Sequence, residues 1–202
     1  MATRLERYIG TLGDVLGRVE ATGPDGEPLV AGDVIAWAVD TARRAHATGN
    51  TVIFVGNGGS AGIASHMAVD FMRNGGIRAL AFNDGVALTC LGNDLGYENV
   101  FAKQIEMYGR AGDLLVAISS SGRSPNILKA VAAARRHRAT VLTLSGFDAD
   151  NPLRRLGDVN LYVPSQAYGF VEISHLALIH AIGDFSLGWG ETTVSQEGKD
   201  IP

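Results

Sequence analysis

The sequence has very little cysteine: Cys90 is the only one among 202 residues. A single thiol excludes an intrachain disulfide and a zinc site built from several cysteines. This usage is typical of a reducing compartment such as the cytoplasm. A lone cysteine is more often a buried apolar residue than a nucleophile, and we expect the buried role for Cys90.

The sequence also lacks an excess of positive charge. Its 17 Lys and Arg residues against 21 Asp and Glu residues give a formal net charge of -4. It therefore has no basic field of the kind that general nucleic-acid binders use, and we expect no nucleic-acid partner. The basic stretch 135–138 is instead expected at the C-terminus of a helix, where cations are favourable.

Long apolar runs are missing as well. No stretch approaches the roughly 20 apolar residues that span a bilayer. Residues 1–20 mix charges with apolar side chains and contain no signal-peptide core. We therefore expect a cytoplasmic protein without a membrane partner. With 46% hydrophobic and 19% charged residues, the chain has the composition of a globular domain.

What the sequence does contain is an alternation of short apolar runs and helical patterns. Residues 1–50 predict a helical extension, with the Gly- and Pro-rich residues 21–28 as a loop between two helices. Residues 51–190 predict an α/β three-layer sandwich with a five-stranded parallel sheet, flavodoxin-like or Rossmann-like. The polar segment 191–202 is expected to fray. Strands are predicted at 51–55, 77–82, 114–118, 140–144 and 160–163, and helices between them at 60–73, 86–91, 98–108 and 124–137, with a last helix at 170–187.

Two loops of small residues are the most informative motifs. The first is Gly56-Asn57-Gly58-Gly59-Ser60, and the second is Ser119-Ser120-Ser121-Gly122-Arg123-Ser124. Each follows a predicted strand and opens a predicted helix. Glycine lets the backbone approach an anion, serine adds hydroxyl donors, and the N–H groups of the following helix point at the same place. Ligands of parallel sheets bind at the carboxyl ends of the strands, so the loops predict one phosphate-binding crevice.

The first loop also satisfies a loose dinucleotide-binding pattern. Gly56, Gly58 and Ala61 have the G-x-G-x-x-A spacing. That reading further requires an acidic residue about 20 positions on, to hold the ribose. Asp84 lies well beyond that position, and a dinucleotide fold has no use for a second serine-rich loop. The sequence therefore favours a phosphosugar over a nucleotide cofactor.

Histidines and carboxylates lie on two of the predicted helices. His66 and Asp70 are four residues apart and share a helix face, so they can co-ligate a metal, transfer protons or form an ordinary surface pair. On the last predicted helix, Glu172 and His180 lie about 80° apart and two turns along, so one site can face both. His175 is about 140° from His180, and we expect it in packing or at an interface.

These motifs together resemble the sugar isomerase (SIS) superfamily and, within it, the phosphoheptose isomerases. The resemblance is carried by the two loops, by His66, by the pair Asn93-Asp94 and by the late helix with Glu172 and His180. It implies conversion of a ketose phosphate, sedoheptulose 7-phosphate or a close relative, to an aldose phosphate through an enediol. It also implies a homotetramer built by the N-terminal helices, with active sites at subunit interfaces.

The resemblance implies roles for particular residues. Asp70 and His180 would transfer protons. Zinc or another divalent metal, where present, would be held by His66, Asp70, Glu172 and His180. Asn93 and Asp94, in a turn after the helix predicted at 86–91, would bind sugar hydroxyls. The full set implied to bind substrate is Asn57, Gly58, Gly59, Ser60, Asn93, Asp94, Ser119, Ser120, Ser121, Ser124 and Glu172.

Two of these positions depart from the family pattern. Asp70 stands where the family has glutamate and is one methylene shorter, whereas Glu172 stands where glutamine is expected and adds a negative charge. Without a metal, two neighbouring carboxylates repel each other and one should hold a proton. We therefore expect this protein to depend on its metal more than the typical member does.

Two other functions stay open on the sequence. One is a non-catalytic SIS protein of the type that binds the replication initiator as a tetramer. Such proteins keep the loops but tend to lose the late-helix histidine, so His180 speaks against this alternative. The other is a phosphosugar-sensing regulatory module, which is disfavoured because no DNA-binding segment is recognisable beside the SIS-like part.

Overall fold

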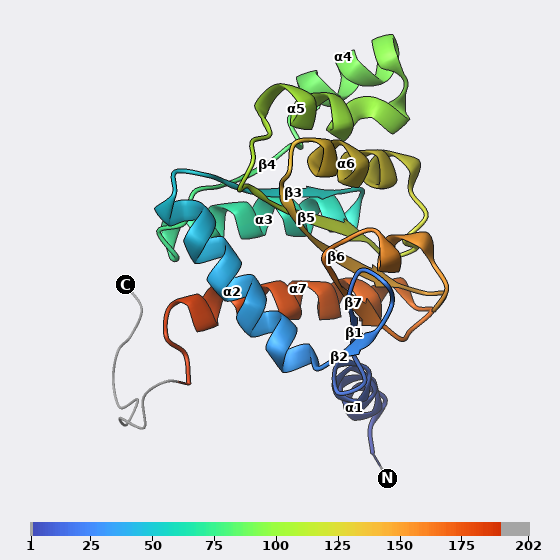
Figure 1. Cartoon of the computed structure of the whole chain (residues 1–202). Coiled ribbons are helices and arrows are strands. Elements are labelled where there is room, and N and C mark those ends of the chain that lie inside the picture. The colour runs from blue at the N-terminus through green and yellow to red at the C-terminus, as the bar shows by residue number, and fades with distance from the viewer. Residues whose placement is uncertain (1, 191–202) are drawn as a thin grey trace.

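A seven-stranded sheet forms the centre of the computed structural model, which describes residues 2–190 (Figure 1). Its strands lie in the order β2-β1-β7-β6-β5-β3-β4. Strands β3 to β7 run parallel, and β1 runs antiparallel to both β7 and β2. The strands are β1 (Glu20–Thr22), β2 (Pro28–Leu29), β3 (Val52–Gly56), β4 (Ala79–Ala81), β5 (Leu114–Ser119), β6 (Thr140–Gly146) and β7 (Val159–Val163).

The five parallel strands have the flavodoxin-like order. Counted along the chain from β3, they lie across the sheet as 2-1-3-4-5, and the direction of the order reverses between β3 and β5. These two strands pair with Gly56 opposite Ile118. The predicted α/β sandwich with five parallel strands is confirmed, and its switch point lies where the two small-residue loops begin.

The loop predicted at 21–28 is a β-hairpin instead. Strand β1 pairs with β7, Ala21 lying opposite Leu161, and β2 pairs with β1. The connecting turn contains Gly26 at φ +81°. Strands of three and two residues are too short to show an alternation of polar and apolar side chains. Only the pairing with β7 identifies them, which is why the sequence reading was wrong here.

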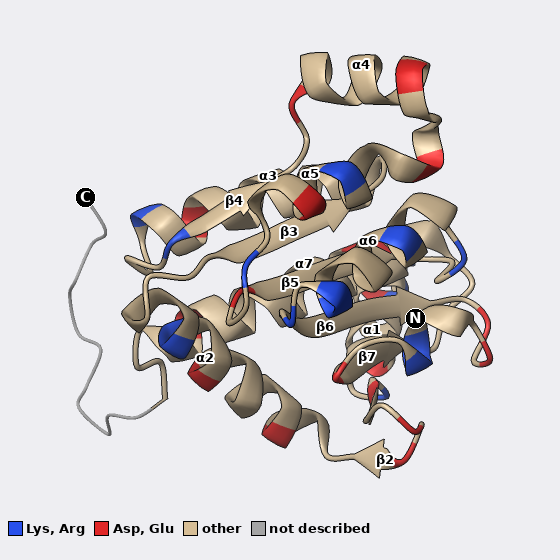
Figure 2. Cartoon of the chain, turned by 45° about the horizontal axis from the view of Figure 1, so that its top comes forward, with Lys and Arg blue, Asp and Glu red and all other residues tan. Residues whose placement is uncertain are grey.

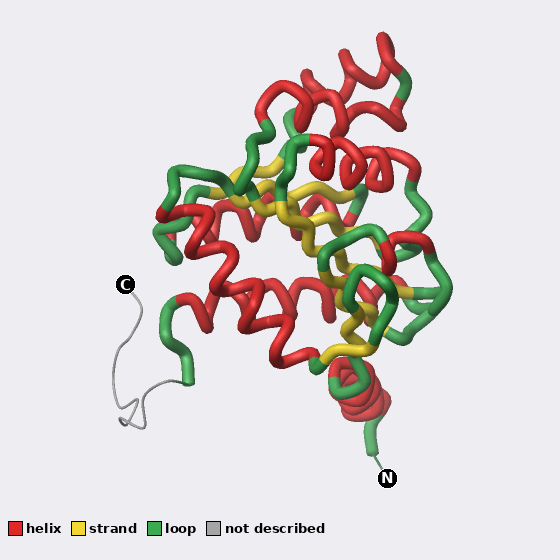
Figure 3. The backbone as a smooth tube through the Cα atoms, viewed as in Figure 1, coloured by secondary structure: helices red, strands yellow, loops and turns green. Residues whose placement is uncertain are grey.

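Helices cover both faces of the sheet (Figures 1 and 3). On one face lie α2 (Ala31–Ala47), α3 (Gly59–Arg73) and α7 (Tyr168–Ser186), and on the other lie α5 (Val100–Tyr108) and α6 (Pro125–Arg136). The remaining helices are α1 (Arg4–Leu16), α4 (Gly85–Leu95) and two short 3₁₀ helices at Tyr97–Asn99 and Pro152–Arg155.

Alternate residues of the central strands belong to two separate cores. Phe54 and Val116 pack with α2, α3 and α7, whereas Ile53 and Leu115 pack with α5 and α6. Strands buried on both faces are apolar throughout. Figure 2 accordingly shows charged residues on the helices and loops around the parallel strands. Strands β6 and β7 also hold buried polar side chains: Asn160 Nδ2 donates to the hydroxyls of Thr143 and Ser145.

Two helices lie outside these layers. Helix α1 is capped by Thr3, whose hydroxyl accepts from the N–H of Glu6, and Val15 is its one buried residue. Helix α4 projects at the top of Figure 1 and buries none of its own residues in the described part of the chain. Cys90 lies on α4 and is exposed, so the expectation of a buried cysteine is wrong.

The N-terminal segment is integrated with the sheet. Helix α2 contributes Val34 and Ala38 to the core shared with α3 and α7, and β1 extends the sheet beside β7. Within residues 2–190, no helix combines the length and the apolar character needed to cross a membrane. The tail predicted to fray, 191–202, lies outside the described residues.

Candidate functional site

The two small-residue loops meet at the switch point of the sheet. We call residues 56–60 the first phosphate loop and residues 119–124 the second phosphate loop. They leave the adjacent strands β3 and β5 and open helices α3 and α6, so two helix N-termini point at one place. A cavity of about 320 Å³ lies there, lined by Asn57, Gly58, Gly59, Ser60, Ile118, Ser119, Ser120, Ser121, Ser124, Tyr168 and Glu172.

Glycine is required at two positions of the first phosphate loop. Gly58 has φ +53°, a left-handed conformation that disfavours side chains. A Cβ on Gly59 would overlap the carboxylate of Glu172, which comes from α7. The Glu172 carboxylate therefore lies against the first residue of α3, where the helix dipole is positive and stabilises an anion.

A pair of amides joins the two phosphate loops. Asn57 Nδ2 donates to Asn126 Oδ1 at 2.9 Å, and Asn126 Nδ2 donates back to Asn57 Oδ1 at 2.8 Å. The hydroxyl of Tyr97 donates to the same Asn57 oxygen at 3.2 Å. Asn126 is buried in the first turn of α6. The sequence analysis did not single out Asn126 or Tyr97. The available signal for Asn126 was its position two residues after the second phosphate loop.

The cavity at the phosphate loops is poor in positive charge. Of the residues that line it within the described chain, Glu172 is the charged one. Arg123 belongs to the second phosphate loop, but its guanidinium lies 3.2 Å from Asp150 and 3.7 Å from Asp148. A phosphate here would be held by hydroxyls, backbone N–H groups and the two helix N-termini.

His66, Asp70 and His180 form a second group, the His–Asp–His cluster. Asp70 Oδ2 lies 3.6 Å from His66 Nε2 and 3.7 Å from His180 Nδ1. One potential ligand atom of each residue lies within 4.8 Å of the others. Helices α3 and α7 pack against each other, which brings His180 to the pair on α3.

The spacing of this cluster fits a divalent metal. Ligand atoms about 2.1 Å from a tetrahedral zinc lie about 3.4 Å from one another, close to the 3.6 and 3.7 Å separations found here. Imidazole nitrogen and carboxylate oxygen are ordinary zinc ligands, and three protein ligands leave one position open for a substrate. The cluster borders a cavity of about 620 Å³ lined by Met67, Asp70, Phe71, Arg73, Asn74, Gly75, His180, Gly183, Asp184 and Leu187.

Glu172, the fourth metal ligand implied by the resemblance, is placed elsewhere. It lines the cavity at the phosphate loops and does not belong to the group gathered within 4.8 Å among the described residues. Eight residues separate Glu172 from His180, which corresponds to about 12 Å along a helix. The angular reading put both residues on one side of α7, but the rise along the helix separates them.

Asn93 and Asp94 lie in the last turns of α4 and not in a turn after it. Helix α4 continues to Leu95, whereas the sequence predicted its end at residue 91. Both side chains are exposed, and Asn93 Nδ2 donates to Asp94 Oδ1 at 2.8 Å. Neither residue lines the cavity at the phosphate loops in the described chain. Their contact with a sugar stays a prediction.

His175 and Asp84 act in packing and helix capping and do not line the cavity at the phosphate loops in the described chain. His175 is fully buried, its Nε2 lies 3.1 Å from the carbonyl oxygen of Ser145, and burial lowers its pKa to about 4. The ring is therefore neutral near pH 7, in agreement with the predicted packing role. Asp84, considered above as a ribose ligand, caps α4 by accepting from the N–H of Ala87 at 2.9 Å.

Fold and site together define a class of protein. A flavodoxin-like sheet with two Gly/Ser loops at its switch point is a phosphate-binding α/β domain, and the His–Asp–His cluster adds groups able to transfer protons or bind a metal. Comparison with known proteins agrees: the SIS domain family matches residues 30–146.

Individual relatives make the class more specific. The chain is 39% identical over 172 residues to the phosphoheptose isomerase of Bradyrhizobium sp. (strain ORS 278), covering 81% of this chain and 84% of the relative. The structure of phosphoheptose isomerase from Neisseria gonorrhoeae superposes with a TM-score of 0.73 at 31% identity, over 91% of this chain and 99% of the other. For the enzyme from Francisella tularensis the TM-score is 0.76 at 26% identity, over 92% and 98%. The chain belongs to the phosphoheptose isomerase family of SIS-domain proteins.

Proposed function

We propose that this protein isomerises sedoheptulose 7-phosphate to D-glycero-D-manno-heptose 7-phosphate through an enediol, in the cytoplasm. The observation that carries the proposal is that both phosphate loops line one cavity at the start of α3, with the His–Asp–His cluster further along α3 and α7. Membership of the phosphoheptose isomerase family supports the choice of substrate.

The phosphate group would bind at the N-termini of α3 and α6. Ser60, Ser119, Ser121 and Ser124 supply hydroxyl donors from the lining of the cavity, and the backbone from Asn57 onward supplies N–H groups. Such an arrangement binds the anion with the same strength in substrate and intermediate, so it contributes to KM more than to kcat.

The length of the site favours a long sugar. His66 and Asp70 follow Gly59 by 7 and 11 residues, which places them about 10 and 16 Å further along α3. His180 follows Glu172 in the same direction on α7. A substrate anchored by its phosphate at Gly59 reaches the His–Asp–His cluster only if its chain is extended. This geometry suits a heptose phosphate better than a triose phosphate.

Asp70 and His180 are the groups that would transfer the protons. The Asp70 carboxylate takes a proton from C1 of the ketose, and the electron pair forms the enediolate; a proton returned to C2 gives the aldose. The imidazole of His180, 3.7 Å from Asp70, moves the proton between the two oxygens. Glu172, beside the phosphate end, would bind the substrate and is also implied as a fourth metal ligand.

A divalent metal such as zinc would be held by His66, Asp70 and His180, and when bound it would stabilise negative charge on the substrate oxygens. Asp70 and His180 would then both hold the metal and move protons, while the two phosphate loops bind the phosphate. The donor set and spacing described above support this site.

We further propose a homotetramer in which α1 contributes to subunit contacts and active sites lie at the interfaces. Leu5, Tyr8 and Ile9 of α1 are exposed apolar residues, and exposed apolar patches commonly mark interaction surfaces. Light scattering on purified protein tests the assembly.

The decisive experiment is incubation of the zinc-supplemented protein with sedoheptulose 7-phosphate in deuterated water, followed by NMR. We expect the aldose phosphate to appear with solvent deuterium at C2, because the enediol exchanges its carbon-bound proton. The proposal would be overturned if no aldose phosphate formed and no deuterium entered C1 of the ketose. Binding of the sugar phosphate without turnover would identify a non-catalytic SIS protein instead.

A further inference from the structure

A loop behind the second phosphate loop holds it in place. Residues 147–151, which we call the buttress loop, connect β6 to the 3₁₀ helix Pro152–Arg155. The flanking backbone contacts the second phosphate loop twice. The N–H of Gly146 donates to the carbonyl of Ser120 at 3.0 Å, and the N–H of Leu153 donates to the carbonyl of Gly122 at 3.2 Å.

Asn151 sets the position of Gly122. Its side chain is buried, and its Nδ2 donates to the carbonyl of Asp148 at 2.7 Å and lies 3.3 Å from that of Gly146. The Oδ1 end of the same side chain lies against Gly122, where a Cβ would overlap it. Gly122 also has φ +61°. A movement of the buttress loop would therefore displace the second phosphate loop directly.

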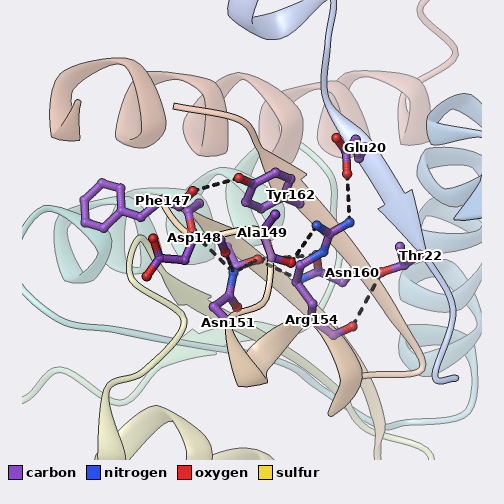
Figure 4. Close-up of polar contacts among 11 residues, drawn as sticks. Glu20, Thr22, Phe147, Asp148, Ala149, Asn151, Arg154, Asn160 and Tyr162 are labelled. Carbon is purple, nitrogen blue, oxygen red and sulfur yellow. Dashed lines mark hydrogen bonds and ion pairs between the residues drawn. The ribbon is translucent and has the colours of Figure 1, made fainter. Parts of the chain in front are cut away.

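Arg154 holds the buttress loop from the other side (Figure 4). Its Nη1 donates to the carbonyl of Ala149 at 2.9 Å, and its Nη2 lies 2.9 Å from the Glu20 carboxylate in β1. The guanidinium carbon lies 4.3 Å above the ring of Tyr162, whose hydroxyl donates to the carbonyl of Phe147 at 2.7 Å. The Arg154 side chain is only 12% exposed, whereas that of Glu20 is 55% exposed, so the guanidinium is held inside the fold while its carboxylate partner faces water.

These contacts form a continuous path from the N-terminal hairpin to the phosphate site. Glu20 orients Arg154, Arg154 holds Ala149, and the buttress loop presents Asn151 to Gly122. The planar guanidinium is suited to this task because it donates in two fixed directions at once. A lysine ammonium can donate to the Ala149 carbonyl or to the Glu20 carboxylate, but it does not present two N–H groups in the fixed planar geometry of a guanidinium.

We propose that Arg154 is a positioning residue for phosphate recognition, acting through the buttress loop, and that β1 thereby takes part in ordering the second phosphate loop. The proposal rests on the proposed function only in that this loop receives the phosphate of the substrate. Arg154 itself does not line the cavity at the phosphate loops in the described chain, so its effect is indirect.

The test compares Arg154→Met, Arg154→Lys and Glu20→Gln with the wild type. We expect Arg154→Met to raise both KM for sedoheptulose 7-phosphate and the dissociation constant of inorganic phosphate about tenfold, equivalent to about 1.4 kcal/mol, with kcat within twofold. Arg154→Lys should recover part of the lost phosphate affinity. Glu20→Gln should lose less affinity than Arg154→Met, because the contact of Arg154 to Ala149 remains.

Arg135→Met is the matched control. Arg135 also bridges a carboxylate and a backbone carbonyl, those of Asp158 and Leu156, but it lies in the last turn of α6, away from the phosphate loops. Thermal unfolding of both Met variants measures any general loss of stability.

Three outcomes overturn the proposal. Unchanged phosphate affinity in folded Arg154→Met shows that the buttress loop needs no such support. If Arg135→Met loses as much phosphate affinity as Arg154→Met at equal folding stability, the loss comes from removing any such arginine and not from the buttress loop. If wild-type protein binds no inorganic phosphate, both the phosphate site and this inference are overturned. If it binds phosphate but has no isomerase activity, only the proposed function fails, and the phosphate dissociation constants of the variants decide this inference.

Discussion

Asn57 and Asn126 hydrogen-bond to each other through both ends of their side-chain amides, at 2.9 and 2.8 Å. Asn57 belongs to the first phosphate loop and Asn126 to the helix that the second phosphate loop opens. The pair therefore fixes the distance between the two loops, although the two asparagines are 69 residues apart in sequence. Two amides suit this role because each offers an NH₂ group that donates and a carbonyl oxygen that accepts, without adding charge near a bound phosphate.

Asn126→Ala should weaken phosphate binding. The variant leaves Asn57 Nδ2 without its acceptor, while Tyr97 still donates to Asn57 Oδ1. Because the two loops are then no longer joined, we expect KM for the sugar phosphate to rise about tenfold, or 1.4 kcal/mol, with a smaller change in kcat. The loss of folding stability should be about 1–3 kcal/mol, the cost of an unpaired polar group. Steady-state kinetics and denaturant unfolding measure the two effects.

Asn50→Ala is the control for this prediction, because Asn50 donates to Thr48 on the exposed surface. It should change neither KM nor kcat. An Asn126→Ala protein with wild-type KM would contradict the role assigned to the amide pair.

Glu172→Gln should strengthen phosphate binding. The Glu172 carboxylate lies in a cavity that would receive a dianion, and removing its charge relieves a repulsion of about 1 kcal/mol, or severalfold in affinity. Calorimetric titration with inorganic phosphate measures the change. Glu106→Gln, which removes an exposed carboxylate paired with Arg136, should have no effect.

A second variant distinguishes the two roles of Glu172, because a glutamine, which the family pattern has at this position, can itself ligate a metal. If Glu172 acts on the substrate, Glu172→Ala keeps its zinc; loss of zinc would assign Glu172 to the metal site. Weaker phosphate binding in Glu172→Gln would contradict the electrostatic argument.

Asp70→Asn should lower the metal content of the protein. Asp70 is the carboxylate that contacts both histidines of the His–Asp–His cluster, and an amide is a weaker zinc ligand than a carboxylate. We expect about one zinc per chain in the wild type and a clear deficit in the variant, measured by elemental analysis. Activity should fall with chelation and return on adding zinc.

Asp184→Asn provides the comparison, since Asp184 lines the same 620 Å³ cavity without joining the cluster. It should retain the metal. Full activity in demonstrably metal-free wild-type protein would contradict the expected metal dependence.

His175 should make folding stability depend on pH. Its pKa in the folded protein is about 4 because burial disfavours the charged ring, against about 6.5 when unfolded. The unfolded chain therefore binds more protons between these values, and stability is lost as pH falls from about 6.5 toward 4. At pH 5 the loss from this residue is about 2 kcal/mol.

Urea unfolding of the wild type and of His175→Gln at pH 7.5 and pH 5 tests this prediction. The variant should be less stable at pH 7.5 but should lose about 2 kcal/mol less on acidification. His137→Gln serves as the control, because His137 lies only partly buried at the end of α6. Equal acid sensitivity of wild type and His175→Gln would refute the assignment.

Local chemistry made the central part of the fold predictable. The apolar runs of β3, β5 and β6 are buried on both faces, and such strands occur in parallel sheets covered by helices. The phosphate loops were predictable for a similar reason. Their glycines and serines act through the backbone and hydroxyls of consecutive residues, so no distant partner is needed to recognise them.

Other features depend on partners that are far apart in the sequence. The hairpin of β1 and β2 exists because β7 offers a free edge, and Cys90 is exposed because α4 leaves the body of the fold. Glu172 and His180 were placed on one side of α7 by their angle, but the packing of α7 along α3 assigned Glu172 to the phosphate loops and His180 to the His–Asp–His cluster.

By itself, then, the sequence determined the class of fold, the two phosphate loops and the residue types of the His–Asp–His cluster, because periodicity and loop chemistry are properties of neighbouring residues. Tertiary structure alone decided how these parts are joined: the Asn57–Asn126 pair, the separation of Glu172 from the His–Asp–His cluster, and the support of Gly122 by Asn151 and Arg154. The physical reason is that a helix or strand pattern specifies which face is buried, whereas the neighbour that covers that face is set by the packing of the whole chain.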